Sequence, residues 1–239
     1  MAWTLVQHAM QASGNSALQR QLGFGASVTA GNLLAMAVSM FSGSSPTATP
    51  ADTLGNTWTQ LGSYSRNGSN TVAIFATLAG TSGGSDTLKW TPNVSVFGGF
   101  VIAEFSPPAG FAAPYTLDGS VTNTGSANPT SSGSIPVAGA NELALAAFCQ
   151  GSGTRTWTPG TGFSNVDVQT NGNTAEGAYM DYATASTAVA DAGAFNVGSL
   201  YAALGASVKA TSSAGGGPWP WYDFGIGLGG QAMTGGICG

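Results

Sequence analysis

The sequence predicts an all-β protein: an antiparallel, jelly-roll-like β-sandwich of about eight core strands in two pseudo-repeated halves, followed by an extended C-terminal arm. Three observations favour this fold. Short apolar or alternating segments are separated by turns rich in Gly, Ser, Thr and Pro. No segment has the sustained 3.6-residue period that a crossover helix would need. Residues 28–39 return in altered form as residues 137–148.

The first half of the chain contains a series of segments whose apolar residues alternate or form short runs. These segments are the predicted strands 2–9, 17–24, 33–41, 58–64, 71–79, 87–90 and 97–105. Residues 33–41 and 97–105 are apolar at odd and even positions alike. That pattern is typical of central strands that are covered on both faces.

Turn residues separate the predicted strands. Asn67-Gly68 predicts a tight hairpin, because both residues tolerate the positive φ of a type I′ turn. Residues 42–52 are predicted to be a loop, because their prolines cannot donate a backbone hydrogen bond to a neighbouring strand. Prolines also mark residues 106–115 as the crossover between the two halves.

The second half repeats the order of the first. Five segments match in sequence order: 33–38 with 143–148, 57–59 with 156–158, 67–70 with 171–174, 71–79 with 175–183, and 98–106 with 202–210. Residues 1–210 are therefore predicted to form one β-sandwich domain, with pseudo-repeats at about 28–106 and 137–210. A further strand is expected at 117–124, between the halves.

The composition excludes several classes of partner. Charged residues make up 6% of the chain, against roughly 25% in an average soluble domain. The net charge is −5 and the five Lys and Arg residues are dispersed, so we expect neither nucleic-acid nor membrane binding. No apolar run approaches the ~20 residues of a membrane span. The N-terminus lacks the basic and apolar regions of a secretory signal peptide.

Titratable groups for catalysis are scarce. His8 is the single histidine, and no Gly-x-Ser-x-Gly motif supplies a nucleophilic serine. A zinc site needs several Cys or His ligands, whereas Cys149, Cys238 and His8 are far apart in the sequence. We therefore expect no enzymatic activity, no cofactor and no metal centre. Cys149 is expected to be a buried thiol within an apolar strand, with a disulfide to Cys238 as the alternative.

The carboxylates offer two further kinds of site. Glycoside hydrolysis needs two carboxylates facing one cleft, and no close pair stands out among Glu104, Glu142, Glu176 and the seven aspartates. Glu104 lies within an apolar strand and is expected to be a hydrogen-bonded structural group. Calcium needs several oxygen ligands in one loop. The candidate sets are Asp52 with Asn56, and Asp167 with Asn171 and Asn173, and a solvated loop is the preferred interpretation of both.

Residues 211–239 form the predicted arm. They open with a Ser/Gly-rich linker and continue with four aromatic residues that are predicted to dock on a partner: Trp219, Trp221, Tyr222 and Phe224. Left exposed, these side chains would form an apolar patch of about 600–1,000 Å², which is larger than a soluble monomer usually shows. The predicted binding surface is a neighbouring subunit, and the sandwich of the same chain is the alternative.

Several short motifs carry a resemblance to a known family. They are Thr-Ala-Gly-Asn-Leu-Leu at 29–34, Gly-Asn-Thr-Trp-Thr at 55–59, Val-Ile-Ala-Glu-Phe-Ser at 101–106, Asn-Glu-Leu at 141–143 and Thr-Trp-Thr-Pro-Gly-Thr-Gly-Phe at 156–163. Together they resemble β-sandwich domains that recur in bacterial surface proteins and in phage-associated proteins. The resemblance covers residues 1–210. It implies the fold and carries no catalytic residues over to this chain.

These observations lead to two expected functions. The first is a structural virion protein of a phage-like particle, a capsid-associated, decoration or tail component that binds other virion subunits or copies of itself. Such a protein would be made in the host cytoplasm and released by lysis, which fits the absence of an export signal. The alternative is an extracellular carbohydrate-binding or adhesive module, in which Trp58, Trp157 or Tyr64 would stack on the sugar rings of a host surface glycan.

Overall fold

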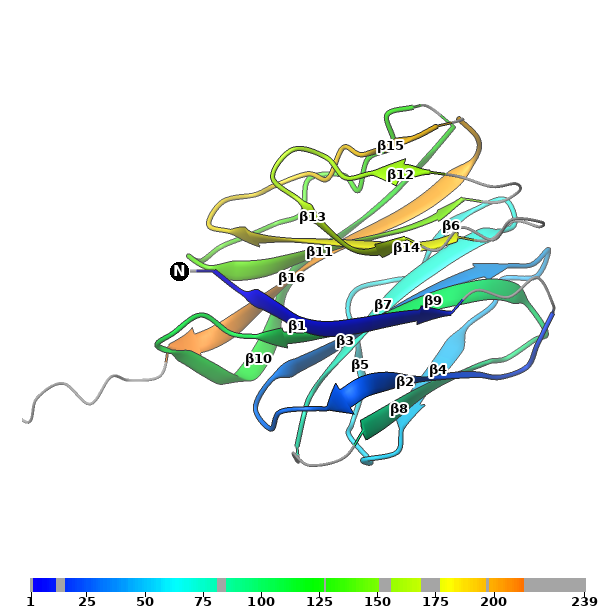
Figure 1. Ribbon diagram of the computed structural model, residues 1–239. Coiled ribbons are helices and arrows are strands. Elements are labelled where there is room, and N and C mark those ends of the chain that lie inside the picture. Colours follow the sequence, from blue (N-terminus) through cyan, green and yellow to red (C-terminus); the bar gives the residue numbers. More distant parts are fainter. Residues whose placement is uncertain are drawn as a thin grey trace, which may run out of the picture.

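The computed structural model describes residues 2–11, 16–80, 85–126, 128–150, 156–168, 177–196 and 198–212. None of these residues lies in a helix, and all strand pairs are antiparallel. The predicted all-β antiparallel sandwich is confirmed (Figure 1).

Two sheets form the centre of the sandwich. Sheet I follows the order β1 (Thr4–Gln11), β9 (Phe97–Ser106), β3 (Leu33–Phe41), β7 (Asn70–Leu78) and β5 (Thr59–Gln60), and β6 (Ser65–Asn67) also pairs with β7. Sheet II follows the order β10 (Phe111–Gly125), β16 (Tyr201–Ser212), β11 (Glu142–Gln150), β14 (Gly177–Ala185) and β13 (Ser164–Val168).

The two sheets have corresponding strand orders. The strands of sheet II that correspond to β1, β9, β3, β7 and β5 are β10, β16, β11, β14 and β13, respectively. The matching segments 33–38 and 143–148 lie in corresponding strands, as do 98–106 and 202–210. Residues 57–59 and 156–158 do not, because Thr59 belongs to β5 of sheet I whereas residues 157–158 lie outside sheet II. Each sheet is built from one half of the chain. Within the first half of the chain, strands of sheet I alternate in sequence with strands of a smaller outer sheet, as in the winding of a jelly roll.

The core between the sheets consists of the inward-facing side chains of both. Alternate residues of β3, Leu33, Ala35 and Ala37, face the corresponding residues of β11, which include Leu143 and Leu145. The remaining residues of these two strands point to the outer faces of their sheets. Each central strand therefore contributes to two cores.

Two smaller layers cover the outer faces. A three-stranded sheet of β2 (Arg20–Ser27), β8 (Ser85–Pro92) and β4 (Ala48–Asp52) covers sheet I, and the pair β12 (Trp157–Thr158) and β15 (Ala194–Phe195) covers sheet II. Figure 1 shows β12 and β15 at the top and β2, β4 and β8 at the bottom. This four-layer stack explains why β3 and β11 are apolar on both faces.

Local details differ from the sequence predictions in ways that have physical reasons. The sequence predicts a loop over 42–52, but residues 48–52 form β4. This strand pairs on one side only, with β8, so Pro50 is tolerated at a sheet edge. The predicted strand 58–64 shortens to β5. The hairpin near Asn67-Gly68 is confirmed, but the type I′ turn is not: Asn67 pairs with Asn70 at the strand ends, and Gly68 has a positive φ of 59° whereas Asn67 does not.

Candidate functional site

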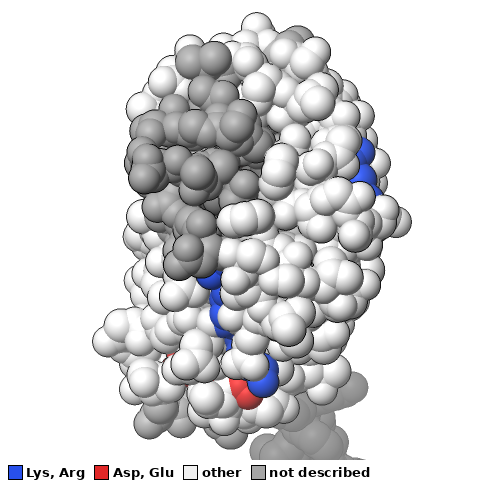
Figure 2. Space-filling model, turned by 90° about the vertical axis from the view of Figure 1, so that its right-hand side faces the viewer, with Lys and Arg blue, Asp and Glu red and all other residues white. Residues whose placement is uncertain are grey.

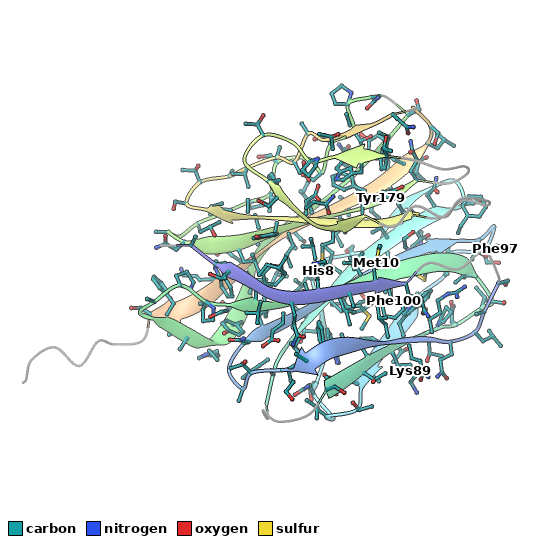
Figure 3. The ribbon with its side chains drawn as sticks, in the orientation of Figure 1. His8, Met10, Lys89, Phe97, Phe100 and Tyr179 are labelled. Carbon is teal, nitrogen blue, oxygen red and sulfur yellow. The ribbon has the colours of Figure 1, made fainter. Side chains whose placement is uncertain are left out.

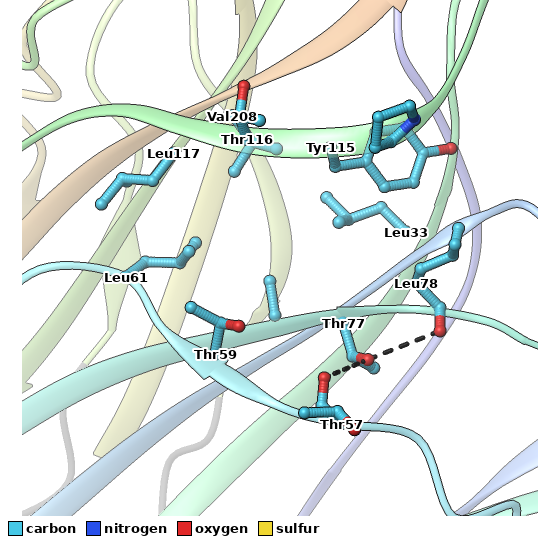
Figure 4. Close-up of a pocket in the computed structure, with 12 residues that line it drawn as sticks. Leu33, Thr57, Thr59, Leu61, Thr77, Leu78, Tyr115, Thr116, Leu117 and Val208 are labelled. Atoms are coloured by element: carbon cyan, nitrogen blue, oxygen red, sulfur yellow. Dashed lines mark hydrogen bonds between the residues drawn. The ribbon is translucent and has the colours of Figure 1, made fainter.

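An apolar groove lies where the terminal strands of the two central sheets face each other. Its walls come from β5 and β7 of sheet I and from β10 and β16 of sheet II, and its volume is about 200 Å³. Figure 4 shows Tyr115, Thr116 and Leu117 on one side and Thr57, Thr59 and Leu61 on the other. The groove is thus an opening into the edge of the sandwich.

The floor and the mouth of the groove are both apolar. Leu33, Leu61 and Val208 are almost fully buried and belong to the core between the sheets. Leu78 and Leu117 at the mouth are 40% and 41% exposed. Large exposed apolar side chains beside an apolar hollow are typical of a binding surface.

Two polar side chains of the groove, those of Thr77 and Tyr115, are hydrogen-bonded within the protein. The Thr77 hydroxyl donates to the Thr57 carbonyl at 2.7 Å. The Tyr115 hydroxyl donates to the Gly31 carbonyl, and burial raises the pKa of Tyr115 to about 12. No Asp, Glu, Lys, Arg or His lies among the described residues that line the groove. The groove therefore offers apolar contact area and no group suited to acid–base chemistry.

Glu104 is a fully buried carboxylate near the end of β9 in sheet I. Its Oε1 accepts hydrogen bonds from the Thr29 amide at 2.8 Å and from Asn32 Nδ2 at 2.6 Å, and its Oε2 accepts one from Gln7 Nε2 at 2.6 Å. The carboxylate therefore ties the turn before β3 and the strand β1 to β9. This is the hydrogen-bonded structural role that the sequence predicted.

Two further buried carboxyl groups meet beneath the outer layer of sheet II. Asp181 on β14 and Asp191 before β15 are both 0% exposed and lie within hydrogen-bonding reach of each other. Trp157 Nε1 donates to Asp181 Oδ2 at 2.6 Å, and the Gly160 amide donates to Asp191 Oδ1 at 2.7 Å. Burial, followed by the neighbouring Asp191, raises the pKa of Asp181 to about 9, and burial also raises the pKa of Asp191. The pair therefore shares a proton at neutral pH.

No close pair of acidic residues stands out in the sequence, yet the fold brings Asp181 and Asp191 together. The arrangement still differs from a hydrolytic site. Aromatic rings close over it: Trp157 lies between Phe148 and Phe195, at centroid distances of 4.5 and 4.6 Å. A glycosidase needs its two carboxyl groups in an open cleft with room for a sugar ring and a water. Asp181 and Asp191 instead fasten the β12–β15 layer to sheet II.

Other acidic residues of the described part of the chain also serve local structure. Asp52 accepts hydrogen bonds from the Asn56 amide, Asn56 Nδ2 and Trp58 Nε1, all within 2.9 Å. The candidate calcium pair Asp52 and Asn56 is therefore a hydrogen-bonded turn. Glu142 accepts from the Gly139 amide at 2.6 Å, and burial raises its pKa. No group of three His, Cys, Asp or Glu that could hold a metal occurs among the described residues.

The aromatic residues considered for glycan stacking are engaged inside the protein. Trp157 is 7% exposed and packs in an aromatic cluster. Trp58 and Tyr64 are half-buried against the outer core of sheet I, and the Tyr64 hydroxyl donates to the Ala48 carbonyl at 3.1 Å. Phe97, at the start of β9 (Figure 3), is the one exposed aromatic side chain in the described part of the chain.

The remaining candidate residues of the sequence lie either elsewhere in the fold or outside its described part. His8 lies exposed on β1 (Figure 3). Cys149 is fully buried, with its Sγ 3.6 Å from Asn70 Oδ1. The residues that lie outside the described part of the chain are Trp219, Trp221, Tyr222, Phe224, Cys238, Asn171, Asn173 and Glu176, and the side chain of Asp167 also lies outside it.

Charge is sparse on the surface as well. The face in Figure 2 shows only a few Lys, Arg, Asp and Glu side chains, and most of it is uncharged. No helix long and apolar enough to cross a membrane occurs in the described ranges. Comparisons with protein-family models, with curated proteins and with solved structures find no match to this chain.

Proposed function

We propose that this chain is a structural subunit of a phage-like particle, a capsid-associated, decoration or tail component that binds other virion subunits or copies of itself. The observation that carries the proposal is the apolar groove between β5 and β10, whose described lining holds no ionisable group except Tyr115. The groove supplies contact area without chemistry, which suits an assembly subunit better than an enzyme.

The way the protein uses its carboxylates supports the same proposal. Glu104, Asp181, Asp191 and Asp52 are bonded to backbone or side-chain groups of neighbouring segments. Their role is to hold layers and turns together. The face in Figure 2 is nearly uncharged where it is described, and the resemblance of the sequence to phage-associated β-sandwich domains points to a virion as its location.

The C-terminal arm would provide the second half of each contact. Trp219, Trp221, Tyr222 and Phe224 are the proposed anchors, and they follow β16 by only a short linker. Buried aromatic side chains are the residues that contribute most to protein interfaces. Each subunit would thus carry a receptor surface on its sandwich and a ligand on its arm.

Truncation after Ser212 tests this proposal, because β16 pairs with β10 through that residue. The molar mass of the full chain and of the truncated chain is measured by light scattering over a range of concentrations. We expect oligomers or particles from the full chain and monomers from the truncated chain. The Trp219→Ala/Trp221→Ala variant of the full chain controls for damage to β16.

Unchanged assembly of both variants would contradict the role of the arm. A full chain that stays monomeric and binds members of a glycan panel would instead favour a carbohydrate-binding surface module. Folding of each variant is checked by circular dichroism in the same samples, so that loss of assembly is separated from loss of structure.

A further inference from the structure

We infer that a polar hollow on the outer sheet of β2, β8 and β4 binds an acidic sugar residue, one that carries both a carboxylate and free hydroxyl groups. The hollow has a volume of about 220 Å³ and lies in a different layer from the groove between β5 and β10. Such a site goes beyond the proposed function, because it takes a small ligand and does not depend on contacts between subunits.

The strand register places the hollow on the solvent side of the outer sheet. Gln21 pairs with Lys89, and Lys89 pairs with Ala51, so these three side chains stand side by side on one face. Leu88 and Trp90, the neighbours of Lys89 in β8, point the other way into the core beneath. Ala51 is short and leaves space between the longer side chains around it. Figure 3 shows Lys89 on this outer sheet.

Lys89 is the feature that points to an anionic ligand. Its side chain is half-buried, and no hydrogen bond or ion pair joins it to another residue of the described part of the chain. The other basic side chains nearby in the fold differ: Arg66 donates to the Pro46 carbonyl at 2.9 Å, and Lys209 lies close to Glu142. A charged donor in a concave place gains a strong hydrogen bond when an anion enters.

Three neutral side chains around Lys89 have unused hydrogen-bonding groups. Gln19 and Gln21 are exposed and Thr87 is half-buried, and none of these side chains is hydrogen-bonded to another described residue. An amide offers both donors and an acceptor, and a hydroxyl group does the same. The hollow therefore combines one positive charge with groups that can donate as well as accept.

The opposite wall of the hollow is fixed in place by hydrogen bonds. Thr53 Oγ1 donates to Oδ1 of the buried Asp86 at 2.9 Å and accepts from the Thr87 amide at 3.0 Å. Asp52 accepts from the amide of Asn56 and from its Nδ2. A wall that is already ordered loses little conformational freedom when a ligand binds.

These groups together favour an acidic sugar over a simple anion. A phosphate group carries nearly two negative charges at neutral pH and offers acceptors only, so it would meet the Asp52 carboxylate without a favourable contact. Sugar hydroxyls both donate and accept, which matches the glutamine amides, Thr87 and Asp52, while one carboxylate pairs with Lys89. The hollow has room for about seven water molecules at the volume each takes in the liquid, which suits one sugar ring.

The test measures the binding of acidic sugars to the full-length chain by saturation-transfer NMR. The probes are glucuronate, galacturonate and N-acetylneuraminate, with glucose as the neutral control and inorganic phosphate as the competing anion. The method detects the ligand, so it works on a monomer and on an assembled particle alike. Competition titrations give the dissociation constant of each probe.

Two lysine variants form the matched pair. Lys89→Gln removes the positive charge of the hollow, and Lys209→Gln makes the same change in net charge at an exposed lysine of β16. We expect at least one acidic sugar to bind the unaltered chain, about three- to tenfold more weakly to Lys89→Gln, and equally to Lys209→Gln. Ala51→Phe, which fills the hollow without a change in charge, should abolish binding. Circular dichroism of each variant checks its folding.

Four results would overturn the site: no binding of any of the three acidic sugars, equal binding of glucose, equal losses in the two lysine variants, or displacement of the sugar by an equal concentration of phosphate. Light scattering on the same samples reports assembly separately, because none of the substituted residues lines the groove or belongs to the arm. A failed sugar site therefore leaves the proposed function standing. A monomeric chain that binds an acidic sugar through Lys89 would support the site and remove the assembly function.

Discussion

The two central sheets have corresponding strand orders, yet they bury their carboxyl groups in opposite ways. In sheet I, three N–H donors surround Glu104. In sheet II, Asp181 and Asp191 face each other and share a proton. Two sheets with the same strand order thus stabilise a buried acid in different ways: N–H donors surround Glu104, whereas Asp181 faces a second carboxyl group, that of Asp191. Strand order alone therefore does not decide how a layer is fastened.

The consequence is a different dependence on pH for each half. The pKa of Asp181 rises from 3.8 in the unfolded chain to about 9 in the fold, so the folded state holds a proton that the unfolded chain releases. The stabilising contribution of this proton is complete below about pH 4 and is lost progressively as the pH rises through about 9. The β12–β15 layer should therefore loosen in alkali before sheet I does.

The largest expected effect comes from Asp181→Asn. The new amide can donate to Asp191 and still accept from Trp157, so it imitates the protonated acid without titrating. We expect a gain of several kcal/mol in the free energy of unfolding at pH 8, at most about 1.4 kcal/mol for each pH unit above the unfolded pKa, and little change near pH 4. Urea unfolding at both pH values measures this, and an equal effect at both would contradict the shared proton.

The next largest effect separates the two tryptophans at matched positions. Trp157 lies in a closed aromatic cluster, whereas Trp58 is half-buried. We expect Trp157→Ala to cost about 3–5 kcal/mol and Trp58→Ala to cost about half as much, because less apolar area leaves water at Trp58. Thermal and urea unfolding of both variants measure the comparison. Equal losses would mean that the two outer layers are equally well packed.

A smaller effect is expected for Glu104→Gln. The amide that replaces the carboxylate would turn an N–H toward at least one of the donors that Glu104 now satisfies, and a buried donor left without an acceptor costs about 1–3 kcal/mol. The loss should appear near neutral pH in urea unfolding. Gln7→Ala, which removes one of the three donors, is the milder control. No loss in the Glu104→Gln variant would show that the donors find other acceptors.

The smallest effect concerns the turns that lead into the two matching central strands. Gly31 (φ 86°) lies before β3 and Asn141 (φ 62°) lies before β11, both in the left-handed region. Asn141→Ala should cost about 1 kcal/mol, because the left-handed conformation is unfavourable for residues with a Cβ, while Asn141→Gly should be nearly neutral. Thermal unfolding of the two variants measures the difference. Equal stability of the Ala and Gly variants would contradict this account of the turn.

Much of the fold was predictable from residue patterns. The central strands were found because runs such as 33–41 and 97–105 are apolar at consecutive positions, which requires cover on both faces. The hairpin near Asn67-Gly68 was found because Gly68 tolerates a positive φ, although the structure does not place Asn67 in that conformation. β4 was missed because a proline in a strand is allowed only at an edge, and the sequence does not show which strands lie at edges.

The candidate sites were harder to predict, because they depend on how distant segments meet. Asp181 and Asp191 belong to a strand and to the segment returning from it, and neither is marked by a motif. The groove arises where β5 and β10 end their sheets, and its residues are ordinary Leu and Thr. Glu104 was recognised because a charged residue within an apolar run must find partners.

The most direct test of the central claim is the size of the purified full-length chain in solution. The chain has a mass of 23.6 kDa, and light scattering across a concentration series gives the mass of whatever forms. The account predicts species much larger than one chain that disappear when residues after Ser212 are removed. A monodisperse species of single-chain mass at every concentration would contradict it.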